Sequence, residues 1–151
     1  VEQELLAIKS KREAYQQNNA QEKSYLILGS ATNPPTRMGM QNLIDYFGAK
    51  DNLSYTIHVA GYQSETLRYV QNPKMEYHGT MNACDLDELQ IQVDGIIINQ
   101  PTTSGVLTRI VENRLAGIPI YANFGAARDF YNLPDVHVYE NFEELELLLR
   151  K

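Results

Sequence analysis

The chain has 151 residues, 43% of them hydrophobic and 21% charged, which is enough for one globular domain and too little for two large ones. Its net charge of −6 leaves no basic stripe to neutralise phosphates, and this argues against nucleic acid as the main partner. We expect no membrane span and no signal peptide, because no apolar run approaches the roughly 20 residues that cross a bilayer.

The first 22 residues differ in character from the rest of the chain. They are polar and helix-favouring, with a short apolar stripe at Leu5, Leu6 and Ile8 and a Gln/Asn cluster at 16–19. We predict that residues 1–22 form a leading helix and linker that crosses from a preceding domain. The chain begins with Val1 rather than Met, which is consistent with a piece of a larger protein. Residues 23–151 are assigned to one domain.

From residue 24 onward, short apolar runs alternate with amphipathic segments. We predict strands at 25–28, 55–60, 75–78, 95–99, 118–122 and 136–139, and helices at 38–47, 64–70, 86–91, 106–116, 124–130 and 142–150. The loop 30–36 contains Asn33-Pro34-Pro35, a strong helix breaker, and Asn141 is the expected cap of the last helix. Six strands alternating with helices predict an α/β fold: a doubly wound, mostly parallel six-stranded Rossmann-like sheet with helices on both faces.

The most informative segment is 94–122, DGIIINQPTTSGVLTRIVENRLAGIPIYA. Two buried strands flank a helix, which indicates a right-handed βαβ crossover in a parallel sheet, where ligands bind at the carboxyl ends of the strands. The loop 102–105 lies at that edge and opens a helix, so its free N–H groups and the positive dipole end suit a phosphate. Glu112 follows Gly105 by two helical turns, and a carboxylate there suits ribose hydroxyls. The segment therefore indicates a sugar nucleotide as ligand.

Several short motifs, in order and spacing, resemble the C-terminal donor-binding domain of GT-B fold glycosyltransferases of the retaining family-4 type. The matching segments are LILG at 26–29, RMG at 37–39, MEYHG at 75–79, SGVLTRIVE at 104–112 and ENRLAGIPI at 112–120. The resemblance covers roughly residues 24–150. It implies that 23–151 is a nucleotide-sugar-binding domain, and that the acceptor belongs to an N-terminal domain absent from this chain.

The resemblance also implies which residues meet the donor. Backbone N–H groups around Gly105 would hold a phosphate, Arg37 and Arg109 would approach the phosphates, Glu112 would bind the ribose, and the turn after the third strand would pack against the base. The residues assigned to the donor are Arg37, Gly79, Thr80, Ser104, Gly105, Val106, Thr108, Arg109 and Glu112. Each also has a plainer interpretation: a small residue at a helix start, a surface arginine, an ordinary βα turn, or a solvated carboxylate. No catalytic residue is assigned.

Three positions depart from the family pattern. Ser30 stands where the family usually has an arginine that contacts the diphosphate, and Arg37 replaces the usual lysine. A guanidinium keeps the charge of an ammonium but has a planar, forked geometry. Ser104 replaces the first glutamate of the family's Glu-x7-Glu signature, so that Glu112 alone remains of the pair.

The remaining candidates for chemistry are few. His58, His78 and His137 fall inside predicted strands, where we expect sheet-face residues rather than bases. No His/Cys/Asp cluster has metal-ligand spacing along the chain, so no zinc site and no other cofactor is predicted. The single Cys84 excludes an internal disulfide and is typical of a reducing compartment, hence a cytoplasmic protein.

The sequence thus predicts the donor-binding half of a glycosyltransferase involved in carbohydrate biosynthesis, with a nucleotide-diphosphate sugar as substrate and little transfer by this chain alone. The alternative is a non-catalytic Rossmann-like interaction or regulatory module with a degenerate nucleotide site. Ser30 and Ser104 favour that alternative.

Overall fold

The computed structural model describes residues 1–151 except 19–21, 102–106, 128–129 and 131, and the side chains of 107 and 108 are also not described. Its centre is a six-stranded sheet in the order β3-β2-β1-β4-β5-β6, in which every neighbouring pair is parallel. The strands are β1 (Ser24–Leu28), β2 (Thr56–Ala60), β3 (Met75–Gly79), β4 (Gly95–Ile98), β5 (Ile120–Asn123) and β6 (Val136–Tyr139). The predicted α/β, Rossmann-like fold is confirmed.

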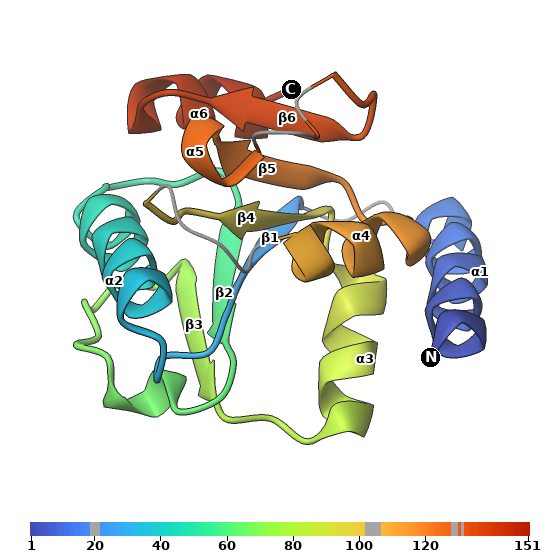
Figure 1. Ribbon diagram of the computed structural model, residues 1–151. Helices are drawn as coiled ribbons and strands as arrows, with labels where there is room; N and C mark the ends of the chain where they lie inside the picture. Colours follow the sequence, from blue (N-terminus) through green and yellow to red (C-terminus); the bar gives the residue numbers. More distant parts are fainter. Residues whose placement is uncertain (19–21, 102–106, 128–129, 131) are drawn as a thin grey trace.

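Helices cover both faces of the sheet. They are α1 (Glu2–Asn18), α2 (Pro34–Gly48), α3 (Ala83–Gln92), α4 (Leu107–Leu115), α5 (Phe124–Ala127) and α6 (Phe142–Leu149). Figure 1 shows α2 on one side of the sheet and α3 and α4 on the other, with α1 outside them. One apolar core joins the sheet to α2 and α6, and the other joins it to α1, α3, α4 and α5. Because both faces are covered, central strands such as β4 are apolar throughout rather than alternating.

The helix starts follow local capping chemistry. Asn33, Asn82 and Asn141 each accept a hydrogen bond from the backbone N–H three residues on, as an N-cap side chain does. The predicted start of the second helix at residue 38 is wrong, because α2 begins at Pro34. Backbone N–H groups in the first turn of a helix have no partner within the helix, so a proline there loses no hydrogen bond. Asn33-Pro34-Pro35 therefore begins α2 instead of preventing a helix.

The predicted helix over 64–70 is also wrong. Only one 3-10 turn forms there, η1 (Ser64–Thr66), and the backbone is extended at Leu67. Leu67 and Val70 pack on the core beside α2 without a helix, so their spacing reflects burial rather than helical periodicity. Of the predicted helix over 124–130, the structure gives α5 as Phe124–Ala127, and residues 128–129 lie outside the described residues. β5 starts at Ile120 rather than residue 118.

The leading helix α1 is docked on α3 and α4. Its low amphipathicity is compensated by one buried cation: Arg12, 6% exposed, donates hydrogen bonds to the carbonyls of Gln90, Val93 and Gly117. These carbonyls lie at the end of α3 and in the turn before β5, so a single guanidinium ties α1 to both. None of the described helices is long and apolar enough to span a membrane.

Candidate functional site

The carboxyl edge of the sheet is built from glycines that let main chains approach closely. A Cβ at Gly61, whose φ is +135°, would lie 1.8 Å from the carbonyl oxygen of Gly29. A Cβ at Gly39 would lie 1.7 Å from the carbonyl oxygen of Asn99. Backbone hydrogen bonds from Ala31 to Tyr62 and from Gly61 to Gly79 connect the loops that follow β1, β2 and β3. The loops after these strands therefore form one rigid platform.

A crevice of about 320 Å³ opens over this platform. Its lining comes from the ends of β1, β2 and β3 and from the helices opposite: Leu28, Gly29, Ser30, Gly61, Tyr62, Thr80, Met81, Leu86 and Arg109. The carboxyl edge is where a parallel sheet binds its ligands. A crevice at the predicted edge, bordered by the loops after β1 and β3, is therefore present.

Arg109 supplies the positive charge of this crevice. It lies in the first turns of α4, is half-buried, and its Nη1 approaches the backbone at Gly29, 3.5 Å from where a Cβ would stand. Burial lowers its pKa, and the nearby carboxylate of Glu112 partly offsets this. Among the described residues the guanidinium has no hydrogen-bonded partner. Within the described part of the chain, it is a half-desolvated cation whose donors are available to an anion.

Glu112 lies beside the crevice rather than in it. It is exposed and lines an adjoining hollow of about 450 Å³ between α1, α3 and α4. The two hollows share Leu28, Leu86 and Arg109 along their common border. The structure thus places Arg109 and Glu112 close together at this border, where Leu28 and Leu86 supply the apolar lining.

Arg37 is placed differently from Arg109. Its guanidinium donates to the carbonyl and hydroxyl of Thr66, both at 2.7 Å, and to the carbonyl of Ala31 at 3.3 Å. It does not line the crevice described above. These bonds brace the loop after β1 against η1, so Arg37 would have to release Thr66 before it could reach a phosphate.

The turn after β3 is held in a defined conformation. Gly79 has φ +67°, and Glu65 accepts hydrogen bonds from the backbone N–H and the hydroxyl of Thr80. Bonds from its own backbone N–H and from Thr80 lower the pKa of Glu65, so it stays ionised. Thr80 lines the crevice together with Arg109.

Several predicted donor contacts lie outside the described residues. They are Ser104, Gly105, Val106 and the side chain of Thr108. Gly61 and Tyr62 also line the crevice, although sequence reasoning did not assign them to the site. Tyr62 is 58% exposed and lies two residues after the end of β2, so the rule that groups the loops after parallel strands was sufficient to find it.

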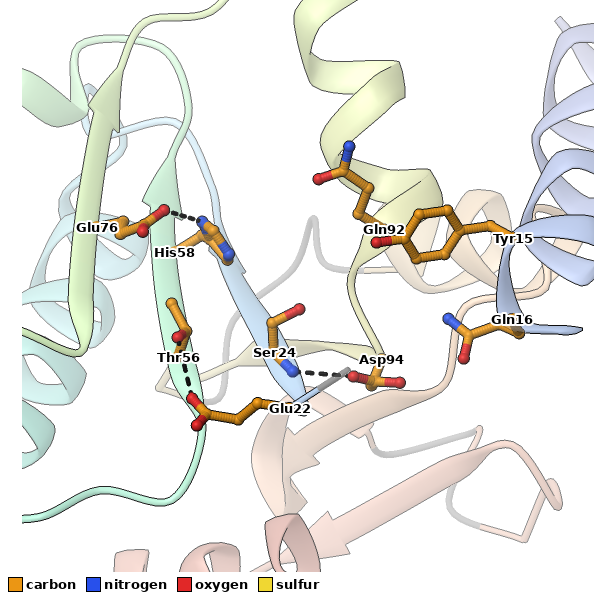
Figure 2. Close-up of a pocket in the computed structure, with 9 residues that line it drawn as sticks. All are labelled: Tyr15, Gln16, Glu22, Ser24, Thr56, His58, Glu76, Gln92 and Asp94. Atoms are coloured by element: carbon orange, nitrogen blue, oxygen red, sulfur yellow. Dashed lines mark hydrogen bonds and ion pairs between the residues drawn. The ribbon is translucent and has the colours of Figure 1, made fainter. Parts of the chain in front are cut away.

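A second polar site lies on the sheet away from the crevice. His58 of β2 contacts Glu76 and His78 of the edge strand β3: its Nδ1 is 3.2 Å from Glu76 Oε2 and 2.9 Å from His78 Nε2. Figure 2 shows Glu76 directed toward the neighbouring His58 on one side of a groove of about 280 Å³, with Gln92 and Tyr15 on the other side. Burial lowers the pKa of His58, although Glu76 opposes the shift. Spacing along the chain did not indicate this cluster.

Known proteins resemble this chain in structure, but the sequence comparisons found no match. No protein-family profile matches the chain, and no curated protein is detectably similar in sequence. Among solved structures, the chain resembles WaaG, a glycosyltransferase involved in lipopolysaccharide biosynthesis, with TM-score 0.62 and 21% identity. It also resembles Anabaena Alr3699/HepE, solved in complex with UDP and glucose, with TM-score 0.65 and 16% identity.

The matches cover nearly all of this chain and less than half of each of those proteins. They extend over 93% of the chain and 41% of WaaG, and over 96% of the chain and 44% of HepE. The resemblance to GT-B glycosyltransferases predicted from the sequence is therefore confirmed at the level of fold.

Proposed function

We propose that this chain is the nucleotide-diphosphate-sugar-binding half of a glycosyltransferase. The observation that carries the proposal is Arg109: a half-buried guanidinium without a hydrogen-bonded partner among the described residues, at the carboxyl edge of a sheet with this fold. A cation held there by its helix would stabilise the negative charge that develops on a leaving diphosphate.

In this proposal, different residues around Arg109 bind different parts of the donor. The diphosphate lies against Arg109 and the N-terminus of α4, where the predicted contacts of Gly105 would add N–H groups. Glu112, across the border, takes the ribose hydroxyls. The base rests on Thr80, Met81 and Tyr62, which present backbone, a thioether and an exposed aromatic ring. Arg37 acts first as a brace of the platform.

Transfer requires an acceptor site from another domain. Exposed apolar side chains stand near the carboxyl ends of the strands, at the start of α2, after β2 and after β5: Met38, Tyr62 and Phe124, each more than half exposed. A second domain closing over this edge would cover them and complete a cleft. The isolated chain is then expected to bind donor weakly and to transfer little.

Calorimetry or saturation-transfer NMR with UDP, GDP, ADP, CDP and TDP tests the proposal. At least one nucleotide should bind, and Arg109→Met should weaken it about 10–100-fold, as expected for one lost charge-assisted contact of about 1.5–3 kcal/mol. Arg150→Met, which removes an equal charge at the C-terminus of α6, should bind like the unmodified chain. Arg37→Ala and Glu112→Ala should each weaken binding less than Arg109→Met.

The alternative, a non-catalytic module, makes the opposite prediction. Ser30 in the crevice and the occupied guanidinium of Arg37 are the features that favour it. No binding of any of the five nucleotides at millimolar concentration, by a chain that is folded by circular dichroism, would reject the donor-site proposal in favour of this alternative.

A further inference from the structure

The cluster of His58, Glu76 and His78 is formed by the sheet itself. His58 and Glu76 are register partners in the β2–β3 pair, and His78 follows Glu76 by two residues, so all three lie on one face. One ligand atom from each lies within 4.8 Å of the others. Because two paired strands hold the Cα atoms, the side chains are arranged before any ligand arrives.

The contacts within this cluster depend on one shared proton. A neutral imidazole nitrogen carries either one proton or one lone pair. As a donor, His58 Nδ1 must share its proton between Glu76 and His78. As an acceptor from His78, it turns its lone pair toward the carboxylate of Glu76. The three groups share one small volume that a positive centre would satisfy better than a single proton.

The distances fit a tetrahedral metal. With metal–ligand bonds of about 2.0–2.1 Å, two ligand atoms of a tetrahedral zinc stand about 3.3 Å apart. The separations of 2.9 and 3.2 Å from His58 Nδ1 are near this value. His58 is the inner ligand, with its side chain 14% exposed, whereas that of Glu76 is 55% exposed and free to close on the ion.

We propose that His58, Glu76 and His78 form a binding site for a divalent transition metal of the zinc type, which fastens the edge strand β3 to β2. Two imidazoles and one carboxylate are a donor set that zinc prefers and that magnesium and calcium, which favour all-oxygen sites, do not. The open groove beside Gln92 and Thr56 leaves room for water as the fourth ligand. The site is separate from the crevice at Arg109, so it does not depend on the proposed function.

Zinc titration by calorimetry tests the site, in a Cys84→Ser background because Cys84 is an exposed free thiol that would bind zinc itself. One equivalent of zinc should bind, with no comparable heat from magnesium. His58→Ala and His78→Gln should each weaken binding about 100-fold or more, since even outer partners of a metal ligand contribute about 10–100-fold. His137→Gln is the matched control, because that histidine stacks on Tyr121 instead and should leave zinc binding unchanged.

Two further readouts separate a metal site from incidental binding. Zinc at about 100 times its Kd should raise the Tm by roughly 5–10 °C, and this rise should disappear in His78→Gln. Cobalt should give the intense visible absorption of a tetrahedral complex, lost in the same variant. The proposal is overturned if the Cys84→Ser chain binds no zinc, or if the His58 and His78 variants, folded by circular dichroism, bind it as tightly as the control.

Discussion

Arg12 is the residue on which the docking of α1 depends most. The rest of α1 offers little to hold it: of its apolar side chains Ile8 alone is fully buried, with Leu5 and Tyr15 partly buried. Arg12→Met keeps a long apolar stem and removes every donor. Three backbone carbonyls, of Gln90, Val93 and Gly117, then lose their guanidinium partner.

The magnitude follows from those bonds. Hydrogen bonds to a charged group contribute about 1.5–3 kcal/mol, but the three share one side chain whose burial, which lowers the pKa of Arg12, offsets part of the gain. We therefore expect a net loss of about 3 kcal/mol. For a chain of this length that corresponds to a fall in Tm of roughly 6–12 °C if α1 unfolds with the domain.

Hydrogen exchange distinguishes global from local loss. If α1 opens by itself, amides of α1 should exchange about 100-fold faster in Arg12→Met while those of β1 and β4 stay unchanged. Lys11→Met is the matched control, since it removes the same charge from the neighbouring, exposed position. Equal Tm and equal exchange in α1 for the Arg12 variant and the unmodified chain would refute the assignment of α1 docking to Arg12.

Three stability predictions can be checked together by thermal and chemical unfolding. Gly61→Ala should cost about 3 kcal/mol or more, because its Cβ would meet the Gly29 carbonyl at a positive φ; a loss below 1 kcal/mol would contradict the close approach. Asn141→Ala should cost about 1 kcal/mol through the lost cap of α6, and Asn141→Ser should restore most of it. Tyr139→Phe should cost about 1–2 kcal/mol by leaving the buried Ile98 carbonyl without its 2.8 Å bond, and an unchanged stability would count against that bond.

The fold could be predicted from the sequence because its signals are local. Short, continuously apolar strands between amphipathic helices imply a parallel sheet covered on both faces, and the order of the motifs around 26–29 and 104–120 indicated the glycosyltransferase fold. The predicted helix over 64–70 correctly placed Leu67 and Val70 against the core but gave the segment the wrong backbone conformation. Two apolar residues spaced three apart are compatible with a helix and with an irregular segment.

Contacts between residues far apart in the sequence determine which side chains line the candidate site. The topological rule for parallel sheets placed the crevice at the correct edge, but could not choose between two arginines. Arg37 was satisfied by Thr66, far along the chain, whereas Arg109 was carried to the crevice by its helix. That choice depends on how loops pack, which no local pattern records.

The sequence by itself therefore determined the order of strands and helices along the chain and the edge of the sheet at which the crevice lies, since both follow from hydrophobic periodicity and chain direction. Tertiary structure alone decided which side chains meet. His58 and His78 are 20 residues apart and become neighbours only through the pairing of β2 with β3. Strand register, set by the packing of whole sheet faces, determines such contacts, and it is not encoded in the spacing of the residues that make them.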